Sequence, residues 1–303
     1  MPRISETVFL VNPAAENGAA GRRWPELAHR AAALGLRGDA LLSERPGQLT
    51  ELARKAAEGG ADLLVAVGGD GTVNEVANGI AGLGVELAVI PRGTGWDFGR
   101  TYGIPRRLED AVEVALRGRT RSVDLGRARY RGWDGAERET LFANIASAGM
   151  SGAIAKRANE TSKALGGKAS YLWATLAVFS RWRSDEVRVR VDAEEHAGRM
   201  HDVVVANGRY FGGGMMICPE AEPGDGLFDV LLIGDLTKRD LVLTLPKTYR
   251  GRHLPHPKAT LLRGTTVEIE TREPLPVELD GEQPGTTPVR FEIVPQALRL
   301  RVP

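Results

Sequence analysis

Cysteine is almost absent from this chain of 303 residues. The single Cys218 excludes an internal disulfide framework and fits a reducing compartment, which predicts a cytoplasmic protein. Net charge is nearly absent too: 40 Lys and Arg against 39 Asp and Glu leave +1, so composition gives no case for a nucleic-acid partner. No apolar run approaches the roughly 20 residues of a membrane-spanning helix. A lipid partner would therefore be met from the aqueous side, by transient membrane association.

What the sequence does have is a strand-to-helix turn rich in glycine. The apolar, β-branched run Asp62–Val67 predicts a buried strand. From Thr72 the apolar residues recur at the spacing of one helix face, as far as Ile80. The turn between them is Gly68, Gly69, Asp70 and Gly71. Such a turn presents backbone N–H groups at a helix N-terminus, which suits a phosphate.

The acid inside this turn makes the prediction more specific. Asp70 would repel a phosphate unless a metal ion or a substrate hydroxyl lies between them, so the loop predicts a nucleotide together with Mg²⁺. Thr72 is a candidate N-cap or phosphate donor, and Glu75 follows three residues later, as in a capping box. The plainer alternative is a tight turn that carries a solvated aspartate.

The letters GGDGTVNEV, from Gly68 to Val76, resemble the nucleotide-binding signature of the diacylglycerol kinase catalytic family. That family includes soluble bacterial lipid kinases, sphingosine kinases and ceramide kinases. The resemblance implies that ATP is bound by Gly68, Gly69, Asp70, Gly71, Thr72, Asn74 and Glu75. It adds Asn12, in an Asn-Pro turn after the first strand, and Ser43, where the family usually has a threonine.

A second motif, Pro91 to Arg100, resembles the family's Pro-x-Gly-Thr-Gly-Asn-Asp-Phe-Ala. It retains Thr94, which the resemblance assigns to the nucleotide, and Asp97. Trp96 stands where the family has Asn, and Gly99 stands where it has Ala. Because an indole is large and largely apolar, we expect Trp96 on the acceptor side of the site. A packed or exposed aromatic at the start of a helix is the alternative.

Three acids are candidates for a catalytic Mg²⁺ site. Asp70 and Asp97 follow predicted strands, and Asp124 lies in a segment that resembles the family's Asp-x-Gly at the domain border. Ligands of parallel α/β sheets bind beyond the carboxyl ends of the strands, so we expect the three carboxylates to converge there and hold Mg²⁺, directly or through water. A Walker A pattern is absent, which excludes a P-loop kinase.

The second half of the chain carries three further motifs of the family. Asn207 to Met215 resembles the lipid-kinase Asn-x-x-Tyr-x-Gly-Gly-Gly-Met, for which NAD kinases have no counterpart. Pro219 to Asp229 resembles a segment that binds a second, structural Mg²⁺; the resemblance assigns this ion to the carboxylate of Asp225 and the carbonyls of Glu222 and Leu227. Leu279 to Glu282 resembles Leu-Asp-Gly-Glu, which supplies the proton acceptor. We rank Glu282 first for this role, then Asp280, then Asp70.

One predicted helix, Ser170–Trp182, is a candidate for membrane contact. It carries Trp173 and Trp182 among other apolar residues and has basic residues at its ends. This is typical of an interfacial helix, but a helix packed on a sheet has the same composition, and that alternative is favoured.

The order of elements predicts two domains. Alternating strands and helices up to residue 125 predict an α/β nucleotide-binding domain of three layers. The glycine-rich signature, of which NAD kinases and phosphofructokinases share a shorter form, implies that the domain resembles theirs. Residues 126–303, rich in strands and Gly/Pro turns, predict a β-sandwich that carries the acceptor and metal segments. Whether the C-terminal tail returns to the first domain stays open.

The sequence therefore predicts an ATP- and Mg²⁺-dependent lipid kinase that phosphorylates a hydroxyl of a diacylglycerol-like acceptor, which enters a cleft between the domains. One alternative is NAD kinase or another small-molecule kinase with the same glycine-rich signature. A second is a nucleotide-binding regulator that has lost catalysis. The retention of five acids (Asp70, Asp97, Asp124, Asp280 and Glu282) weighs against it, since a dead site has no physical need for them. The acceptor lipid and a homodimer stay open.

Overall fold

The computed structural model describes the backbone of residues 6–93, 95–165, 174–179 and 181–303, and their side chains except those of 158–165. The chain divides into two compact units. Unit 1 runs to Asp124 and also contains Gln296–Pro303, and unit 2 is Leu125–Pro295.

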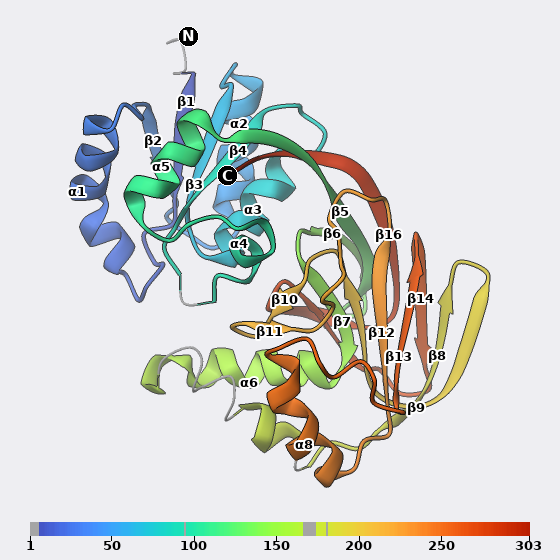
Figure 1. Ribbon diagram of the computed structural model, residues 1–303. Coiled ribbons are helices and arrows are strands. Elements are labelled where there is room, and N and C mark those ends of the chain that lie inside the picture. The colour runs from blue at the N-terminus through green and yellow to red at the C-terminus, as the bar shows by residue number, and fades with distance from the viewer. Residues whose placement is uncertain (1–5, 94, 166–173, 180) are drawn as a thin grey trace. The chain divides into compact units, whose positions relative to one another are not determined.

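Unit 1 is built on a parallel sheet with helices on both faces (Figure 1). Its elements are β1 (Thr7–Val11), α1 (Ala19–Ala33), β2 (Asp39–Leu42), α2 (Gln48–Glu58), β3 (Leu63–Gly68), α3 (Asp70–Ile80), β4 (Glu86–Pro91), α4 (Asp97–Tyr102) and α5 (Leu108–Arg117). The strand order is β4-β3-β1-β2. The last residues of the chain pair with β4, also in parallel.

The strands of this sheet are apolar on both faces because helices cover both. One face presents residues such as Phe9 and Val65 to α1 and α5. The alternate residues, Leu10 and Leu64, are fully buried on the opposite face, where α2 and α3 pack against the strands and against each other. This layering confirms the predicted three-layer α/β domain.

Unit 2 is mainly antiparallel. Its elements are β5 (Arg119–Gly132, which begins in unit 1), β6 (Glu137–Phe142), β7 (Ile145–Gly149), α6 (Met150–Leu165), β8 (Asp185–Val191), β9 (Glu194–Ala206), β10 (Tyr210–Phe211), β11 (Met215–Met216), β12 (Phe228–Gly234), α8 (Lys238–Thr248), β13 (Ala259–Gly264), β14 (Thr266–Thr271), β15 (Pro276–Leu279) and β16 (Glu282–Val302, which ends in unit 1). Residues 174–179 are also helical.

Two long strands, β9 and β16, belong to both layers of the sandwich. The first part of β9 pairs with β8 and its last part with β7 and β12. In the same way β16 pairs with β15 near its start and with β14 further on. The core between the layers contains Phe142, which stacks on Phe228 and meets Phe291 edge to face. The predicted β-rich second domain is confirmed.

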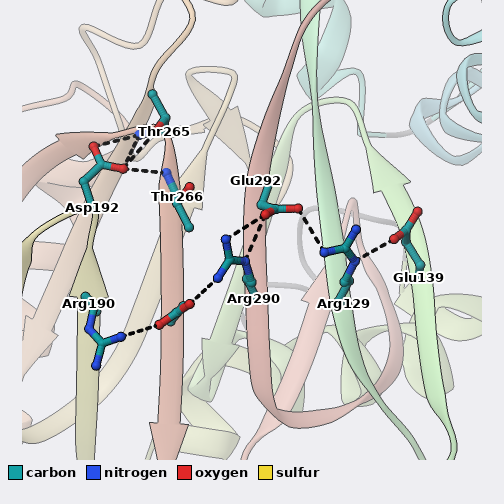
Figure 2. Close-up of polar contacts among 9 residues, drawn as sticks. Arg129, Glu139, Arg190, Asp192, Thr265, Thr266, Arg290 and Glu292 are labelled. Carbon is teal, nitrogen blue, oxygen red and sulfur yellow. Dashed lines mark hydrogen bonds and ion pairs between the residues drawn. The ribbon is translucent and has the colours of Figure 1, made fainter.

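The solvent face of one layer carries a row of ion pairs across five strands, from β8 to β6 (Figure 2). Each cation lies between two acids or at the end of the row, in the order Arg190, Glu268, Arg290, Glu292, Arg129 and Glu139. Beside the row, Asp192 accepts hydrogen bonds from the N–H groups of Thr265 and Thr266. Alternating charges of this kind compensate one another and keep an exposed sheet face polar.

Candidate active site

The residues that follow the four strands of unit 1 meet at one edge of its sheet. Asn12 follows β1, Ser43 follows β2, Gly69 follows β3 and Arg92 follows β4. Neighbouring backbones are joined there: the N–H of Ser43 donates to the carbonyl of Val11, and that of Arg92 to Gly68. Because the strands are parallel, this is the edge at which such sheets bind ligands.

The turn from β3 to α3 consists of Gly69 alone. A Cβ on Gly68 would lie 2.1 Å from the hydroxyl oxygen of Thr72, and one on Gly93 would lie 2.5 Å from the Cα of Gly69. These two glycines are therefore required by close packing. Gly71 differs, because no described atom lies within 4 Å of the position that its Cβ would take, and the residue is exposed. It lies in the first turn of α3, where backbone N–H groups without a helical partner can bind an anion.

Thr72 is held by Asn12, whose side-chain amide donates to the threonine hydroxyl over 3.1 Å. The prediction of a capping box between Thr72 and Glu75 is wrong. Helix α3 begins at Asp70 with Gly69 as N-cap and without a side-chain cap, so Thr72 lies inside the first turn. Glu75 instead accepts a hydrogen bond from the N–H of Leu49 and thereby caps α2. Asn74 accepts one from the side chain of Asn78.

Asp70 bonds the backbone at the start of α4. Its two carboxylate oxygens accept hydrogen bonds from the N–H groups of Asp97 (3.1 Å) and Phe98 (3.0 Å). Burial raises the pKa of this carboxyl, although the two N–H groups and the Arg100 guanidinium act in the opposite direction. Asp70 thus links the N-terminus of α3 to that of α4.

The second carboxylate, Asp97, lies close to the first. The position of a Cβ on Gly95 would be 2.7 Å from one oxygen of Asp70 and 3.9 Å from one of Asp97, so both face this glycine. The other oxygen of Asp97 pairs with Arg100 at 2.5 Å. Asp124 is buried in β5 and accepts a hydrogen bond from the N–H of Gln296 at 2.7 Å.

The structure therefore shows Asp70 and Asp97 together, and Asp124 bound to the returning C-terminal segment. Within the described residues, no three His, Cys, Asp or Glu side chains form a group that would hold a metal ion by themselves. Thr94, the remaining nucleotide candidate of this motif, lies outside the described residues.

Trp96 is packed inside unit 1, where its side chain is only 3% exposed. The indole N–H donates to the carbonyl of Ile104 over 3.2 Å. The ring lies over the Cα of Gly99, since a Cβ there would be 1.9 Å from a ring carbon. The two departures from the family motif are thus in contact. A role on the acceptor side stays a prediction, and a ring this buried would exert it through the shape of α4.

Two arginines of this edge were missed in the sequence. Arg92 is half-buried, its Nε has no hydrogen-bond partner among the described atoms, and burial is the main cause that lowers its pKa. Glu16 acts in the opposite direction, Arg23 and Arg30 lower that pKa further, and Glu109 raises it, so charges of both signs lie around Arg92. Arg106 donates to the carbonyl of Gly93 at 2.9 Å. A partly desolvated guanidinium beside an open helix N-terminus favours an anion. The only signal in the sequence was an arginine inside the Pro-x-Gly-Thr-Gly motif.

In unit 2, the turn between β15 and β16 carries the predicted proton acceptors. The carboxylate of Asp280 accepts hydrogen bonds from the N–H groups of Ala143 (2.7 Å), Asn144 (2.9 Å) and Ile145 (2.9 Å). Asp280 itself has φ 47°, a left-handed conformation in which Asp is tolerated. Glu282, two residues later, is exposed. Asp280 therefore holds the turn in place, and Glu282 is the more accessible of the two acids.

A third acid of this turn, Glu278, was not singled out in the sequence. It is buried and accepts hydrogen bonds from the Ser147 hydroxyl (3.0 Å) and the Gly281 N–H. Burial raises the pKa of Glu278 to about 8, and Asp280 contributes in the same direction. Its position between the apolar residues Val277 and Leu279 was the available signal, because a charged residue inside an apolar strand needs a partner.

The Asn-x-x-Tyr motif packs against the segment that Asp280 holds. The side chain of Asn207 donates to the carbonyl of Ala143 at 2.8 Å, and Asn144 donates to the carbonyl of Tyr210 at 2.6 Å. The three glycines that follow, Gly212–Gly214, all have positive φ. Glycine is needed in such a run because other residues rarely adopt this backbone.

The predicted structural Mg²⁺ ligands already have protein partners. Asp225 accepts a hydrogen bond from the N–H of Leu227 and forms an ion pair with Arg263. Glu222 pairs with Arg209 at 2.9 Å. Asp229, buried beside this cluster, lies 3.7 Å from Arg263 and keeps an oxygen without a hydrogen-bond partner among the described atoms. Asp225 and Asp229 could attract a cation, and in this structure the guanidinium of Arg263 compensates their charge.

The candidate membrane helix is only partly described. Trp173 lies outside the described residues, whereas Trp182 packs against two apolar clusters of unit 2. For Trp182, packing in the protein is thus the observed environment. In the part of the chain that the structure describes, no helix is both long and apolar enough to cross a bilayer.

Comparison with known proteins places both units. Residues 6–128 match the diacylglycerol kinase catalytic domain, and residues 144–302 match the YegS C-terminal NAD kinase beta sandwich-like domain. The fold resembles that of a Bacillus anthracis protein of known structure at TM-score 0.81, with 24% identity and coverage of 100% of this chain and 97% of that one. A second solved chain, a diacylglycerol kinase from the same organism, gives 0.74 at 23% identity over 100% and 98% of the two chains.

Curated relatives agree with this assignment. The Pseudomonas aeruginosa protein named "Probable lipid kinase YegS-like" is 35% identical over 85% of this chain and 82% of its own. A Mycobacterium tuberculosis diacylglycerol kinase is 30% identical over 99% of this chain and 96% of its own. Both domains, in this order and over this length, show that the chain belongs to the family of diacylglycerol kinases and YegS-like lipid kinases.

Proposed function

We propose that this protein is a lipid kinase that transfers the terminal phosphoryl group of ATP to a hydroxyl of a diacylglycerol-like lipid, with Mg²⁺. The observation that carries the proposal is the edge of unit 1. There the open backbone of Gly71 in the first turn of α3 adjoins the carboxylates of Asp70 and Asp97. An anion-binding helix end beside two acids suits a phosphate chain that is accompanied by a cation.

Different residues of this edge would contact different parts of ATP or hold the binding turn in place. The N–H groups of the first turn of α3 would donate hydrogen bonds to phosphate oxygens, and the half-buried guanidinium of Arg92 adds a positive charge. Asn12 holds Thr72 and so fixes the turn. Phosphoryl transfer proceeds through a loose transition state, so positioning and compensation of charge account for most of the rate.

The acids fit a hard cation at this edge. Asp70 and Asp97 both present an oxygen toward Gly95, and Mg²⁺ takes few protein carboxylates and completes its shell with phosphate and water. Asp70 and Asp97 would hold the ion, with Asp124 acting through water. Bound there, Mg²⁺ would neutralise charge on the phosphates. A second, structural ion would use Asp225 with the carbonyls of Glu222 and Leu227, and its binding would release Arg263 from Asp225.

Glu282 is our choice for the proton acceptor. It is exposed and follows a turn that is fixed on one side by Asp280 and on the other by Glu278. A base on a fixed turn needs little reorganisation to reach a substrate hydroxyl. Asp280 is less suited, since both of its oxygens bind backbone N–H groups.

Transfer of labelled phosphate from ATP to dispersed diacylglycerol tests the proposal. Asp70→Asn is expected to lower turnover by at least about 10²-fold, because the neutral side chain would hold Mg²⁺ more weakly and the charge on the phosphates would then be compensated less. Glu282→Gln should cost roughly 10² to 10⁴-fold, the range for a general base. Asp62→Asn, an exposed acid of the same unit, is the matched control. Near wild-type transfer by Asp70→Asn, or transfer to NAD in place of lipid, would refute the proposal.

A further inference from the structure

Helix α8 of unit 2 is apolar on two sides, and the described part of the chain covers only one of them. Its inner residue Leu241 is buried against Met150 and Phe179, which places α8 beside α6 (Figure 1). Its outer residues Val242 and Leu243 are 63% and 56% exposed. A helix at a water-exposed surface is normally polar on its outer side. The pair Val242 and Leu243 is therefore unusual enough to need a partner.

Cations surround this apolar pair. Lys238, Arg239, Lys247, Arg250 and Arg252 are all exposed, and none of them forms an ion pair within the described part of the chain. The one acid of the helix, Asp240, is engaged with the Thr237 N–H and with Lys258. The surface is thus basic without compensation, in a chain whose net charge is only +1.

The cations and the apolar residues share one side of the helix. Val242 and Leu243 follow Arg239 by three and four residues, Pro246 follows them by four and three, and Arg250 comes four residues after Pro246. Just beyond them is a surface hollow of about 290 Å³ that is lined by Pro246, Lys247, Arg250 and Arg252. Three guanidinium or ammonium groups around one hollow suit a phosphate-bearing headgroup.

We propose that this side of α8 is the surface by which the protein binds an anionic lipid bilayer. Val242 and Leu243 enter the interface between headgroups and acyl chains, and the five cations contact headgroup phosphates. Apolar residues flanked by Lys and Arg are the composition by which helices bind a membrane surface. The inference rests on the proposed function in one respect, since a lipid acceptor is what brings the enzyme to a bilayer.

Cosedimentation with vesicles tests the surface directly. The wild-type protein is expected to bind phosphatidylcholine vesicles that contain phosphatidylglycerol and to bind pure phosphatidylcholine much more weakly. The double variant Lys247→Ala/Arg250→Ala should weaken binding roughly 25-fold, at about fivefold for each cation. Arg54→Ala/Lys55→Ala, which removes the same charge from exposed positions of α2, should leave binding unchanged.

The apolar pair has its own variant, Val242→Ser/Leu243→Ser, which should reduce binding to anionic vesicles even at low salt. Both residues are mostly exposed, so the melting temperature should stay near that of the wild type. The inference would be overturned if the wild-type protein did not bind anionic vesicles, or if the α8 variants bound them as tightly as the wild type.

A second assay separates this surface from the proposed function. Kinase activity toward a short-chain diacylglycerol, dissolved as monomers, does not require a bilayer. The α8 variants should keep this activity while they lose activity on vesicles. If every protein is inactive on the monomeric lipid but vesicle binding still depends on α8, the proposed function fails and the surface stands.

Discussion

Trp96 and Gly99 are expected to be energetically coupled. The indole occupies the space that the side chain of residue 99 would need: a Cβ on Gly99 would lie 1.9 Å and 2.1 Å from two carbons of the ring. Distances under 3.0 Å are not tolerated by a rigid, buried group. Trp96 also has φ 60°, a left-handed conformation that Asn adopts far more readily than Trp. We therefore expect the family pair, Asn with Ala, to be compatible, and the mixed pair Trp with Ala to clash.

The magnitudes follow from this geometry. Gly99→Ala alone is expected to cost about 3 kcal/mol, the upper part of the range for overpacking, because the ring cannot leave its site. Trp96→Asn alone removes a buried ring at about 3–5 kcal/mol, less about 1 kcal/mol of relieved backbone strain. Adding Gly99→Ala to Trp96→Asn should cost less than about 0.5 kcal/mol, since the methyl group enters vacated space. The coupling energy is then about 2.5 kcal/mol.

Urea unfolding of the wild type, both single variants and the double variant measures this coupling. Gly71→Ala is the control for stability, because the same change is made in the first turn of α3, where no described atom lies within 4 Å of the added Cβ. It should change the free energy of unfolding by less than about 1 kcal/mol. If Gly99→Ala costs the same in both backgrounds, the two positions are independent and the reasoning is refuted.

Three further predictions concern buried and paired acids. Glu278 ionises near 4.5 in the unfolded chain but only at about 8 when folded, so the free energy of unfolding should fall by roughly 1.4 kcal/mol per pH unit as pH rises between these values. Glu278→Gln keeps an acceptor for the Gly281 N–H, and its amide NH2 donates to the Ser147 hydroxyl in place of the present bond from that hydroxyl. The variant should flatten this dependence in urea unfolding; an unchanged slope assigns it to another group. Asp225→Ala should abolish any rise of the melting temperature with Mg²⁺. In the presence of a chelator it should lower the free energy of unfolding by at most about 1 kcal/mol, because it removes a half-exposed ion pair with Arg263. A Mg²⁺ effect that persists in the variant would exclude this ion site. Asp280→Asn should lower stability by about 1–3 kcal/mol, since backbone N–H groups lose their acceptor, whereas Glu282→Gln should lower turnover alone; equal loss of stability in both would contradict the roles given to them.

Local pattern was enough to predict the elements that carry the site. The apolar run before Gly68 and the helix spacing after Thr72 predicted β3 and α3, and alternation of strands with helices predicted the parallel sheet. These features depend on residues that are neighbours in the chain, which is why a single sequence reveals them. The sequence also predicted a glycine-rich turn, but it did not show why each glycine is needed. Gly68 and Gly93 are required by close packing, whereas Gly71 has space around its Cβ position among the described residues.

Contacts between distant segments could not be predicted. Glu75 was paired with Thr72 in the same turn, yet it bonds Leu49 of another helix. Arg92 was passed over because nothing in its sequence neighbourhood shows that its side chain would be half-buried. Glu75 can accept the same kind of hydrogen bond from a residue of its own helix turn or from a residue of a neighbouring helix. Only the tertiary structure decides which of the two forms.

The same consideration changes what the retained acids mean. Their retention argued for catalysis on the ground that an inactive site has no need of them. In the structure, however, Asp70, Asp124 and Asp280 each accept backbone N–H groups from distant segments, and a regulator with this fold would need those bonds as well. An unsatisfied buried N–H costs about 1–3 kcal/mol whether or not the protein transfers phosphate. Glu282 therefore offers the test that best separates catalysis from stability, because it is exposed and its loss should remove activity without loss of stability.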